Sequence, residues 1–486
     1  MSFIHRNIAA FFIFVLVASL GWIYGGTMTS VIRPILPWLI VIMYEIALCF
    51  PQRRDGESTG HARKRVWKSL RRDPLSWVVF AFMLILSVPF VNVGNPPDIK
   101  LIPFCADAMK HYGVFLWFAS SLSAALLAKH SLTRSGKRTL VEMIIWNGAA
   151  MAVFGFVQLV AGAPGPLWST LVKNPGHFFS TFGYPNMAGD YFTVLFCLSI
   201  GHWRDRLDDI RHNLEGTHAA KRMSKHKLFW KKHYLLIAAL LNFFAALNTL
   251  SRAAIILVSA SAILLFAHAG IVALFRMNKV ERVKAGAFYA LAILIMAALA
   301  TVFMPDGVHR EMKTIDSREA LDRVTGRGES HSIIATQIWR EHLLFGCGGW
   351  GYAIFCVEKQ PRRTYWAPGS ANVHNDHLQF LVEHGLVGYG MLVAVVVLLL
   401  IPIGKSWITI ANGVRFLATK RQKTPSQSFF ALPGSAFSLL VAAAVPIIHA
   451  FGDCPLRSPA VLTLFYVTLA CVPGYLPREE HKMEES

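Results

Sequence analysis

The sequence predicts an all-α polytopic membrane protein with about 12 transmembrane helices and one large extramembrane loop. Of its 486 residues, 54% are hydrophobic and only 16% are charged, whereas about a quarter of the residues of a soluble protein are charged. The mean hydropathy is +0.44, and the apolar residues form runs long enough to cross a bilayer. This composition argues against a water-soluble enzyme. It excludes a disordered chain, because disorder requires low hydrophobicity.

Twelve apolar runs approach the length of about 20 residues that a membrane-spanning helix needs. The first run follows Arg6 and a second comes soon after it, so we expect an uncleaved first helix rather than a signal peptide. The sixth and seventh runs are short, and we expect them to be tilted or broken. The predicted spans are 8–25, 31–50, 75–93, 111–128, 139–163, 188–202, 234–248, 253–275, 285–304, 378–403, 431–449 and 459–476.

The basic residues sort strongly between the two sides of this topology. The side that holds both termini receives 33 of the 48 Lys and Arg residues, and the short loops of the other side hold only six. Cytoplasmic loops carry the excess of positive charge, so we expect cytoplasmic termini and an outward-facing segment 305–377. Aromatic residues lie among the cations of loops 51–74 and 203–233, as in nucleic-acid-binding proteins. Membrane orientation and anionic headgroups already explain these loops, so no nucleic-acid partner is predicted.

The chain divides into three parts on this basis. Residues 1–304 contain the first nine spans, 305–377 form a periplasmic loop module, and 378–486 contain the last three spans and a short cytoplasmic tail. Residues 330–345 within the loop have helical periodicity, and GCGGWG (346–351) then ends that helix with a glycine turn. A phosphate-binding loop is a poor interpretation of these glycines, because no Lys-Ser or Lys-Thr follows them.

Seven cysteines show no spacing typical of a zinc or haem site. Cys347 and Cys356 are both predicted on the outer side, where they can pair if the compartment is oxidising. Two buried free thiols are the alternative.

Ionisable residues cluster where the tenth span begins, and such residues at membrane depth are functional candidates. One interpretation is a metal site, although no HExxH-type pattern is present. A second is helix capping by Asn375 or Asp376, and a third is a general base, because histidine titrates near neutral pH. The last two are compatible, and in a helix His374 and His377 would share a face. The cluster comprises His374, Asp376, His377, Glu383 and His384.

Three further outward segments carry polar residues. Arg252 lies in a tight turn between the seventh and eighth spans, where it either snorkels to the headgroups or binds a phosphate or carboxylate. Segment 175–192 is rich in aromatic residues and contains Asn186 as a predicted helix cap. The short loop between the last two spans carries His449, Asp453 and Arg457.

These residues predict a cation-lined cavity with a histidine at one face of the membrane. Arginines there would hold a departing diphosphate, and the histidine would take a proton from an incoming hydroxyl. No Walker motif and no GxGxxG pattern is present, so the energy of a reaction would come with the substrate. The predicted constellation is Arg252, Arg323, Arg327, His374 and Asp453.

Four motifs in order resemble one family. NTLSRAA is similar to a Ser-Arg turn, FGYPNMAGDY to a Phe-x-x-Pro-Asn-x-x-Ala segment, and the large outer loop ends in GCGGWG. His374-Asn375, nine residues and then Gly385-Leu386-Val387-Gly388 match a pattern of HN, nine residues and GxxG. With these features the chain resembles the O-antigen ligase family, within the wider group that includes O-antigen polymerases and O-oligosaccharyltransferases.

The resemblance implies a GT-C-like membrane glycosyltransferase with defined residue roles. His374 would activate the acceptor hydroxyl, and Arg252 would contact the donor diphosphate. A second essential arginine is expected in the outer loop, where Arg327 is the first candidate and Arg323 the second, and His331 lies close to the expected position. Asn186, Asn375 and Asp453 would support this catalytic and diphosphate-binding set.

The implied reaction is an inverting transfer without metal or cofactor. The donor would be undecaprenyl-diphosphate-linked O-antigen and the acceptor lipid A–core, at the periplasmic face of the bacterial inner membrane. Ligases often continue past GxxG with Thr-x-Trp, whereas this chain reads Tyr389-Gly390-Met391. This departure makes a ligase harder to distinguish from a polymerase. It does not affect the resemblance to the wider group.

Three alternatives remain open. An O-antigen polymerase would use the same donor with a second lipid-linked glycan as acceptor. A protein O-oligosaccharyltransferase is less expected, because little chain follows the twelfth span. A secondary transporter would show paired repeats and charges at the bilayer midplane, whereas the polar residues here gather at one face.

Overall fold

The protein is described here from a computed structural model, which covers residues 3–23, 25, 29–94, 102–170, 178–213, 224–276, 283, 286–287, 331–359, 372–419 and 432–476. The named elements in these residues are all helical, which confirms the all-α prediction. In chain order they are α1 (Phe3–Trp22), α2 (Thr29–Cys49), α3 (Thr59–Arg72), α4 (Pro74–Ser87), η2 (Val88–Val91), α5 (Ala108–His130), α6 (Arg134–Val160), η3 (Pro166–Trp168), α7 (Pro185–Asn213), α9 (Lys225–Asn248), α10 (Arg252–Arg276), α14 (Gly351–Lys359), α15 (Asp376–Thr419), α16 (Gly434–His449), η5 (Pro455–Arg457), α17 (Pro459–Cys471) and η6 (Val472–Tyr475).

Six helices in the described part of the chain are long and apolar enough to cross a membrane, and three shorter apolar helices accompany them. The sixth and seventh predicted spans lie in the continuous helices α7, with 29 residues, and α9, with 24, and neither helix is among the six. Polar and basic turns extend both helices beyond their apolar runs. The ninth predicted span lies almost entirely outside the described residues, so the count of 12 stays a prediction.

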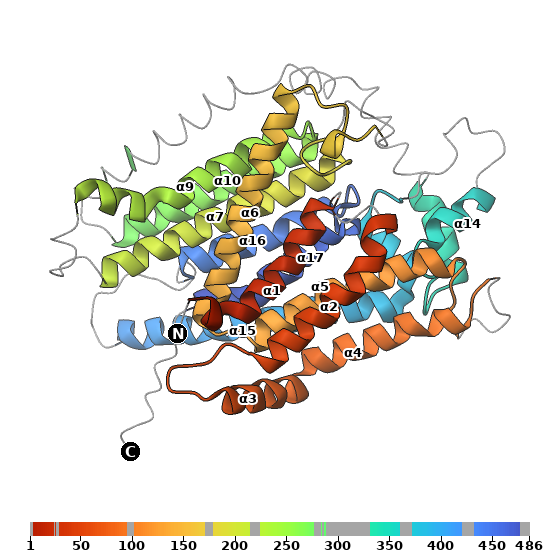
Figure 1. The fold of residues 1–486 in the computed structure, drawn as a ribbon, viewed down its shortest axis with the longest axis horizontal. Coiled ribbons are helices and arrows are strands. Elements are labelled where there is room, and N and C mark those ends of the chain that lie inside the picture. Colours follow the sequence, from red (N-terminus) through yellow and green to blue (C-terminus); the bar gives the residue numbers. More distant parts are fainter. Residues whose placement is uncertain are drawn as a thin grey trace.

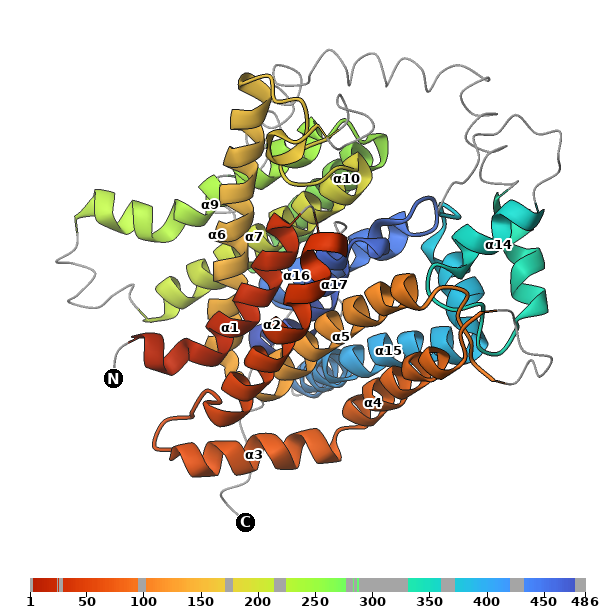
Figure 2. The same ribbon diagram turned by 45° about the vertical axis from the view of Figure 1, so that its right-hand side comes forward.

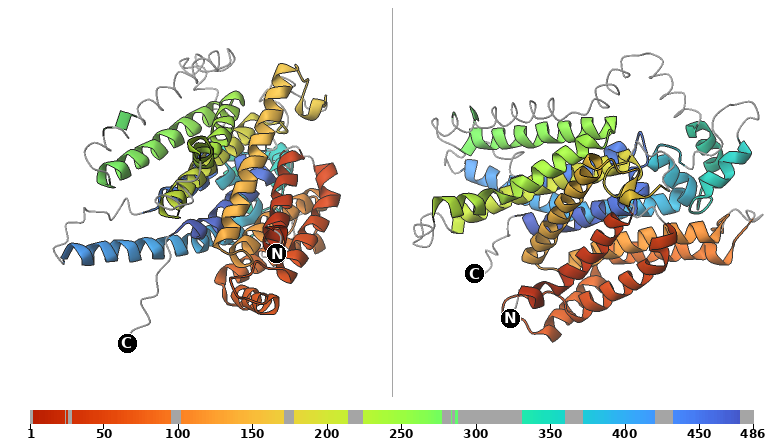
Figure 3. Two further views of the ribbon diagram at one scale, coloured as in Figure 1. Left: turned by 60° about the vertical axis from the view of Figure 1, so that its left-hand side comes forward. Right: turned by 45° about the horizontal axis from the view of Figure 1, so that its top comes forward.

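Helix α17 lies at the centre of the bundle. All 13 of its residues are buried, and it packs against α5 and α16. Helices α7, α9, α10 and α16 pack together on one side of it, and α1, α2, α4, α5 and α15 lie toward the other (Figure 3). Because Pro459 occupies the first turn after the Ser458 cap, the helix starts sharply at one end of the bundle.

The bundle has two chemically different ends. Figures 1 and 2 show α3 near the start of α1 and far from α14. Segment 51–74 is not wholly a loop, because Ser58 caps α3 and the helix buries Ala62 and Val66. Helix α15 runs from Asp376 past Pro402, about 40 Å at 1.5 Å per residue. This length exceeds the hydrocarbon core of about 30 Å, so α15 is long enough to cross a membrane.

Gly385 breaks α15 near its start. Its φ of 64° and ψ of −173° belong to a region that only glycine occupies readily. The amides that follow the break, Leu386 N and Val387 N, donate to Leu343 O at 2.9 Å and Leu344 O at 3.0 Å. Backbone groups inside a membrane must be satisfied by protein, and the segment before the glycine turn supplies these acceptors.

The GCGGWG segment forms the predicted turn and packs on the bundle as expected. Cys347 N donates to Val382 O at 2.9 Å and Gly348 N to Glu383 O at 3.0 Å, which satisfies carbonyls before the break in α15. Gly349 N donates to His111 Nδ1 at 2.9 Å. A Cβ on Gly346 would lie 2.4 Å from the backbone carbon of Glu383, so this approach requires glycine.

The helix predicted over 330–345 ends earlier than expected, since its last helical residue among the described ones is Glu341. It buries Ile334 and Ile338, whereas Leu343 and Leu344 follow it in a turn and are exposed. Cys347 and Cys356 are buried and are not joined by a disulfide. The structure therefore agrees with the alternative of two buried thiols.

Replacing Gly385 should destabilise the protein, because a Cβ there would lie 2.2 Å from Leu344 O and the backbone conformation itself costs a non-glycine residue about 1–3 kcal/mol. We expect Gly385→Ala to lower the unfolding temperature in detergent and the yield in membranes. Gly390→Ala is the matched control, since no atom lies within 4 Å of its added Cβ. Equal unfolding temperatures of the two variants would contradict this account of the break.

Candidate active site

His374 and Asp453 form a hydrogen-bonded pair at the end of the bundle opposite α3. His374 precedes α15 with φ of 57°, and its Nδ1 lies 3.0 Å from Asp453 Oδ1. The His374 side chain is 41% exposed and that of Asp453 only 6%. The histidine is therefore partly exposed, whereas the carboxylate that it contacts is buried.

Asn375 holds this loop at the start of α15. Its Oδ1 accepts a hydrogen bond from Leu378 N at 3.0 Å, which confirms the predicted helix cap. His374 and His377 do not share a helix face, because His374 lies before the helix. His377 turns instead to the hydroxyl of Tyr389 at 3.0 Å and to Ile447 O at 3.2 Å.

Asp453 is surrounded by donors. Its carboxylate accepts hydrogen bonds from Tyr184 Oη at 2.8 Å, from Cys454 N at 2.8 Å and from Asn186 Nδ2. Burial raises the pKa of a carboxyl, but hydrogen bonds from His374 and Asn186 outweigh it and hold the pKa of Asp453 well below its ordinary value. Asp453 is therefore ionised at neutral pH.

The ionised carboxylate determines the tautomer of His374. A carboxylate only accepts hydrogen bonds, so the proton of a neutral His374 lies on Nδ1. This leaves the lone pair on Nε2, at the opposite side of the ring. A histidine in this state is a general base with its basic atom pointing away from Asp453.

Asp376 joins the two loops that position the His374–Asp453 pair. Asp376 N donates to Ala450 O at 2.9 Å and to Asp453 O at 3.2 Å, and Asp376 Oδ2 accepts from Leu456 N at 2.7 Å. The start of α15 is thereby fixed to the loop between α16 and α17. Asp376 thus ties the loops together instead of capping its own helix.

A buried ion pair reinforces this junction. Arg457 Nη1 lies 2.9 Å from Glu383 Oε2, and both side chains are at most 3% exposed. The Arg457 guanidinium also lies 4.5 Å from the ring centroid of Trp350, where cation–π attraction adds to the pair. The contact links η5, α15 and the glycine turn.

Segment 178–184 positions Tyr184 and Asn186. Ser180 Oγ donates to Met151 O at 2.8 Å, and Thr181 Oγ1 donates to Gly21 O at 2.7 Å. These bonds anchor the segment to α6 and α1. The Asn186 side chain does not cap α7 as predicted, because its amide donates to Asp453 and to Tyr184 Oη.

Arg252 begins α10 at the same end of the bundle. Ser251 caps the helix, since its Oγ accepts from Ala254 N at 3.1 Å. A Cβ on Gly189 of α7 would lie 2.2 Å from Ala254 Cβ, so the first turns of the two helices are in close contact. Gly189 is one helical turn from Asn186. The start of α10 therefore lies beside the start of α7, where Asn186 donates a hydrogen bond to Asp453.

The structure brings together part of the predicted constellation. His374, Asn375, Asn186 and Asp453 form one contact network, and Arg252 starts the adjacent helix. Arg323 and Arg327 lie outside the described residues.

Neither Tyr184 nor Tyr352 was predicted from the sequence, and His331 was noted only beside the expected loop arginine. The His331 ring lies 6.1 Å from that of His374, and its Nδ1 is 2.9 Å from Tyr352 Oη. Tyr184 lies in the FGYPN segment. The aromatic–Pro–Asn pattern of that segment is the sequence feature from which Tyr184 could have been identified. For His331, the only such feature was its position near the expected loop arginine.

His374, Asp453 and Cys454 are close enough to hold a metal ion, with one ligand atom of each within 4.8 Å of the others. Burial and the neighbouring Asp453 raise the pKa of the Cys454 thiol well above its ordinary value. The protonated thiol donates to Asp453 Oδ1 at 3.2 Å, whereas a metal ligand would be a thiolate. The geometry therefore favours a hydrogen-bonded group, and metal independence stays a prediction.

The comparisons with known proteins identify one family. Residues 237–393 match the family model described as O-antigen ligase, and a search of curated proteins finds no match to the chain. The matched segment contains Arg252, the glycine turn and His374 with its GxxG sequence. The match supports a membrane glycosyltransferase of the ligase or polymerase type, with a polysaccharide or lipid-linked glycan as substrate. Over residues 237–393 the chain is thus similar to the O-antigen ligase family, in agreement with the resemblance seen in its motifs.

Proposed function

We propose that the protein is an O-antigen ligase that transfers a glycan from undecaprenyl diphosphate to lipid A–core. The observation that carries the proposal is the His374–Asp453 pair, because it provides an oriented base at a membrane surface. The family match supports the substrate class. The donor supplies its own leaving group, so the reaction requires no nucleotide.

The proposed step is an in-line displacement at the anomeric carbon of the donor. The acceptor hydroxyl oxygen forms the new glycosidic bond while its proton passes to His374 Nε2. The bond from the anomeric carbon to the diphosphate oxygen breaks, and undecaprenyl diphosphate leaves with the electron pair. The configuration at the anomeric carbon is inverted.

Asp453 and Arg252 stabilise charges of opposite sign that develop in this step. Asp453 orients His374 and stabilises the imidazolium that forms when the proton arrives. Arg252 offers a planar guanidinium that suits a diphosphate, at a helix start whose dipole also favours an anion. Arg327, or Arg323 as the second candidate, would add a further cation from the outer loop.

The orientation of the site follows from the charge distribution. We place the α3 end at the cytoplasm, because the cations of α3 and of the first turns of α6 are concentrated there. The His374 end then faces the periplasm, with residues 331–359 as the described part of an outer loop module over 305–377. Both amphiphilic substrates would reach this end from the bilayer.

Replacing Asp453 with Asn should reduce turnover about 10²-fold or more, the range that a positioned base contributes. The amide keeps the shape of the carboxyl but removes the charge that fixes the Nδ1–H tautomer. Initial rates and membrane yield would be measured together. Asp107→Asn is the control, because Asp107 caps α5 through Lys110 N at 2.9 Å and asparagine caps equally well. Unchanged rates in the Asp453 variant would contradict its positioning role.

Replacing Arg252 with Lys should lower transfer at least tenfold, because a point charge cannot reproduce the bidentate fork toward a diphosphate. The measurement is the initial rate as donor concentration is varied. Arg340→Lys serves as the control, since Arg340 is an exposed arginine on the outer helix 331–341. Full activity of the Arg252 variant would favour a snorkelling side chain.

Reconstitution tests the reaction itself. Purified protein would be mixed with undecaprenyl-diphosphate glycan and lipid A–core, without nucleotide and with chelator, and the products separated by size. We expect glycan on lipid A–core, with none formed by a His374→Ala variant that still inserts and folds.

The other products are equally informative. Longer glycans on undecaprenyl diphosphate, with untouched lipid A–core, would identify a polymerase. Activity only after a divalent metal is restored would contradict metal independence. An unreactive protein that still binds donor would favour a transporter.

A further inference from the structure

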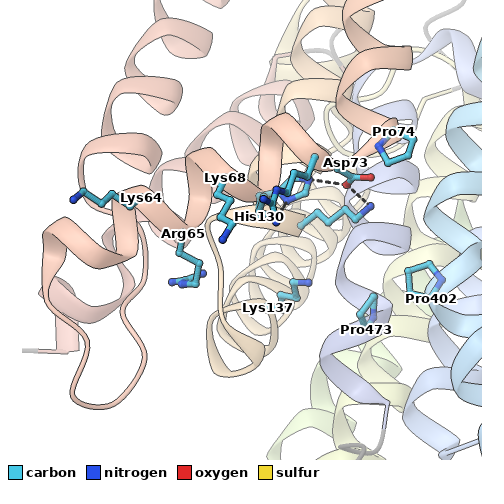
Figure 4. A pocket seen from close by; sticks show the side chains of 12 residues that line it. Lys64, Arg65, Lys68, Asp73, Pro74, His130, Lys137, Pro402 and Pro473 are labelled. Atoms are coloured by element: carbon cyan, nitrogen blue, oxygen red, sulfur yellow. Dashed lines mark hydrogen bonds and ion pairs between the residues drawn. The ribbon is translucent and has the colours of Figure 1, made fainter.

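A second polar site lies at the α3 end of the bundle. It is a cavity of about 880 Å³ formed where α3, the start of α4, the end of α5 and the start of α6 meet α15 and η6 (Figure 4). Because α15 carries Pro402 of this cavity about 40 Å from Asp376, the cavity is separate from the candidate active site. Its lining is Lys64, Arg65, Lys68, Ser69, Arg72, Asp73, Pro74, Lys129, His130, Lys137, Pro402 and Pro473.

Some of the lining charge is already paired. Asp73 lies 2.6 Å from Lys129 Nζ and 2.9 Å from His130 Nε2, and Arg65 pairs with Glu57 at 2.9 Å. Burial opposes the ionisation of Asp73, but the bonds from His130 and Lys129 hold the pKa of its carboxyl well below the ordinary value. This carboxylate is therefore engaged by its own neighbours.

Three exposed cations remain on α3. Lys64, Lys68 and Arg72 recur every four residues and so lie on one face of the helix. Within the described residues, none of the three has an ion pair with a carboxylate. They form a row along one wall of the cavity, and such a row favours a ligand with more than one anionic oxygen.

Lys137 adds a buried cation beneath them. It is only 7% exposed, lines the cavity from α6 (Figure 4), and within the described residues has no ion pair or side-chain hydrogen bond. An ammonium on a side chain largely removed from water loses part of its hydration, and a partner of opposite charge compensates that loss. An anion in the cavity would provide the missing partner.

The surroundings of the cavity are those of a membrane interface. Trp67 of α3 and Trp77 of α4 are 53% and 59% exposed, and tryptophan is enriched at the headgroup level of membrane proteins. Trp77 Nε1 donates to Arg71 O at 2.9 Å, which ties the two helices together. Beyond Trp77, α4 continues with the exposed apolar Phe80 and Leu84, a surface that suits acyl chains.

We propose that this cavity binds the phosphate head group of an anionic membrane phospholipid. The phosphate oxygens contact Lys68, Arg72 and Lys137, and the acyl chains follow the apolar surface of α4. The bound lipid fixes α3 against the ends of α5, α6 and α15. The site does not depend on the proposed glycan transfer, since it lies at the other membrane surface.

The test is lipid binding by the full chain in neutral detergent, followed by native mass spectrometry during titration with phosphatidylglycerol or phosphatidylcholine. We expect selective retention of phosphatidylglycerol. Each cation near a headgroup contributes about a fivefold change in affinity, so Lys68→Gln/Arg72→Gln should weaken binding about 30-fold. Lys137→Gln should weaken phosphatidylglycerol binding as well. If that variant fails to fold, the Lys68→Gln/Arg72→Gln variant still tests the proposal.

Matched variants separate the cavity from general surface charge. Arg63→Gln/Arg71→Gln removes two cations from the same helix at positions outside the cavity lining and should bind phosphatidylglycerol like the wild type. Equal losses in the two double variants would overturn the proposal, as would equal retention of the two lipids. Inorganic phosphate is the competitor, and its binding without any lipid retention would assign the site to a soluble anion instead.

Discussion

Buried carboxylates at one end of an apolar bundle control how this protein is built. An ionised carboxylate away from water is costly unless donors surround it, and here the donors come from distant parts of the chain. Asp453 is hydrogen-bonded to Tyr184 in the segment before α7 and to His374 in the loop before α15. Glu383 accepts a hydrogen bond from Arg457 of η5. The requirement to satisfy these groups brings the helix ends together, and the geometry of His374 results from it.

The glycines have a related role in the backbone. Gly385 interrupts α15 inside an apolar span, where unpaired amides and carbonyls would be strongly unfavourable. Residues 343–348 supply partners on both sides of the interruption, and their close approach tolerates no Cβ at Gly346. The glycine turn and the GxxG sequence are therefore two halves of one contact.

The two ends of the bundle are suited to different anions. At the His374 end, a partly exposed histidine beside a buried carboxylate is suited to proton transfer, with Arg252 at the start of a neighbouring helix. At the α3 end, several cations surround a cavity without a free carboxylate, which suits binding without chemistry. The length of α15 keeps the two sites at opposite ends of the bundle, so a headgroup bound at one end cannot occupy the other.

The sequence by itself determined the membrane class, the helical architecture, the resemblance to the O-antigen ligase family, and the Asn375 cap beside His374. These properties depend on composition, on apolar runs and on residues close together in the chain. Only the tertiary structure decided that Asp453 orients His374, that Asn186 binds Asp453 rather than capping α7, and that Asp376 joins two loops. Each of these contacts is made between residues far apart in sequence, and helical periodicity carries no information about which helix ends meet. Burial then selects the partners, because each buried charge requires a donor that only the packed bundle can bring to it.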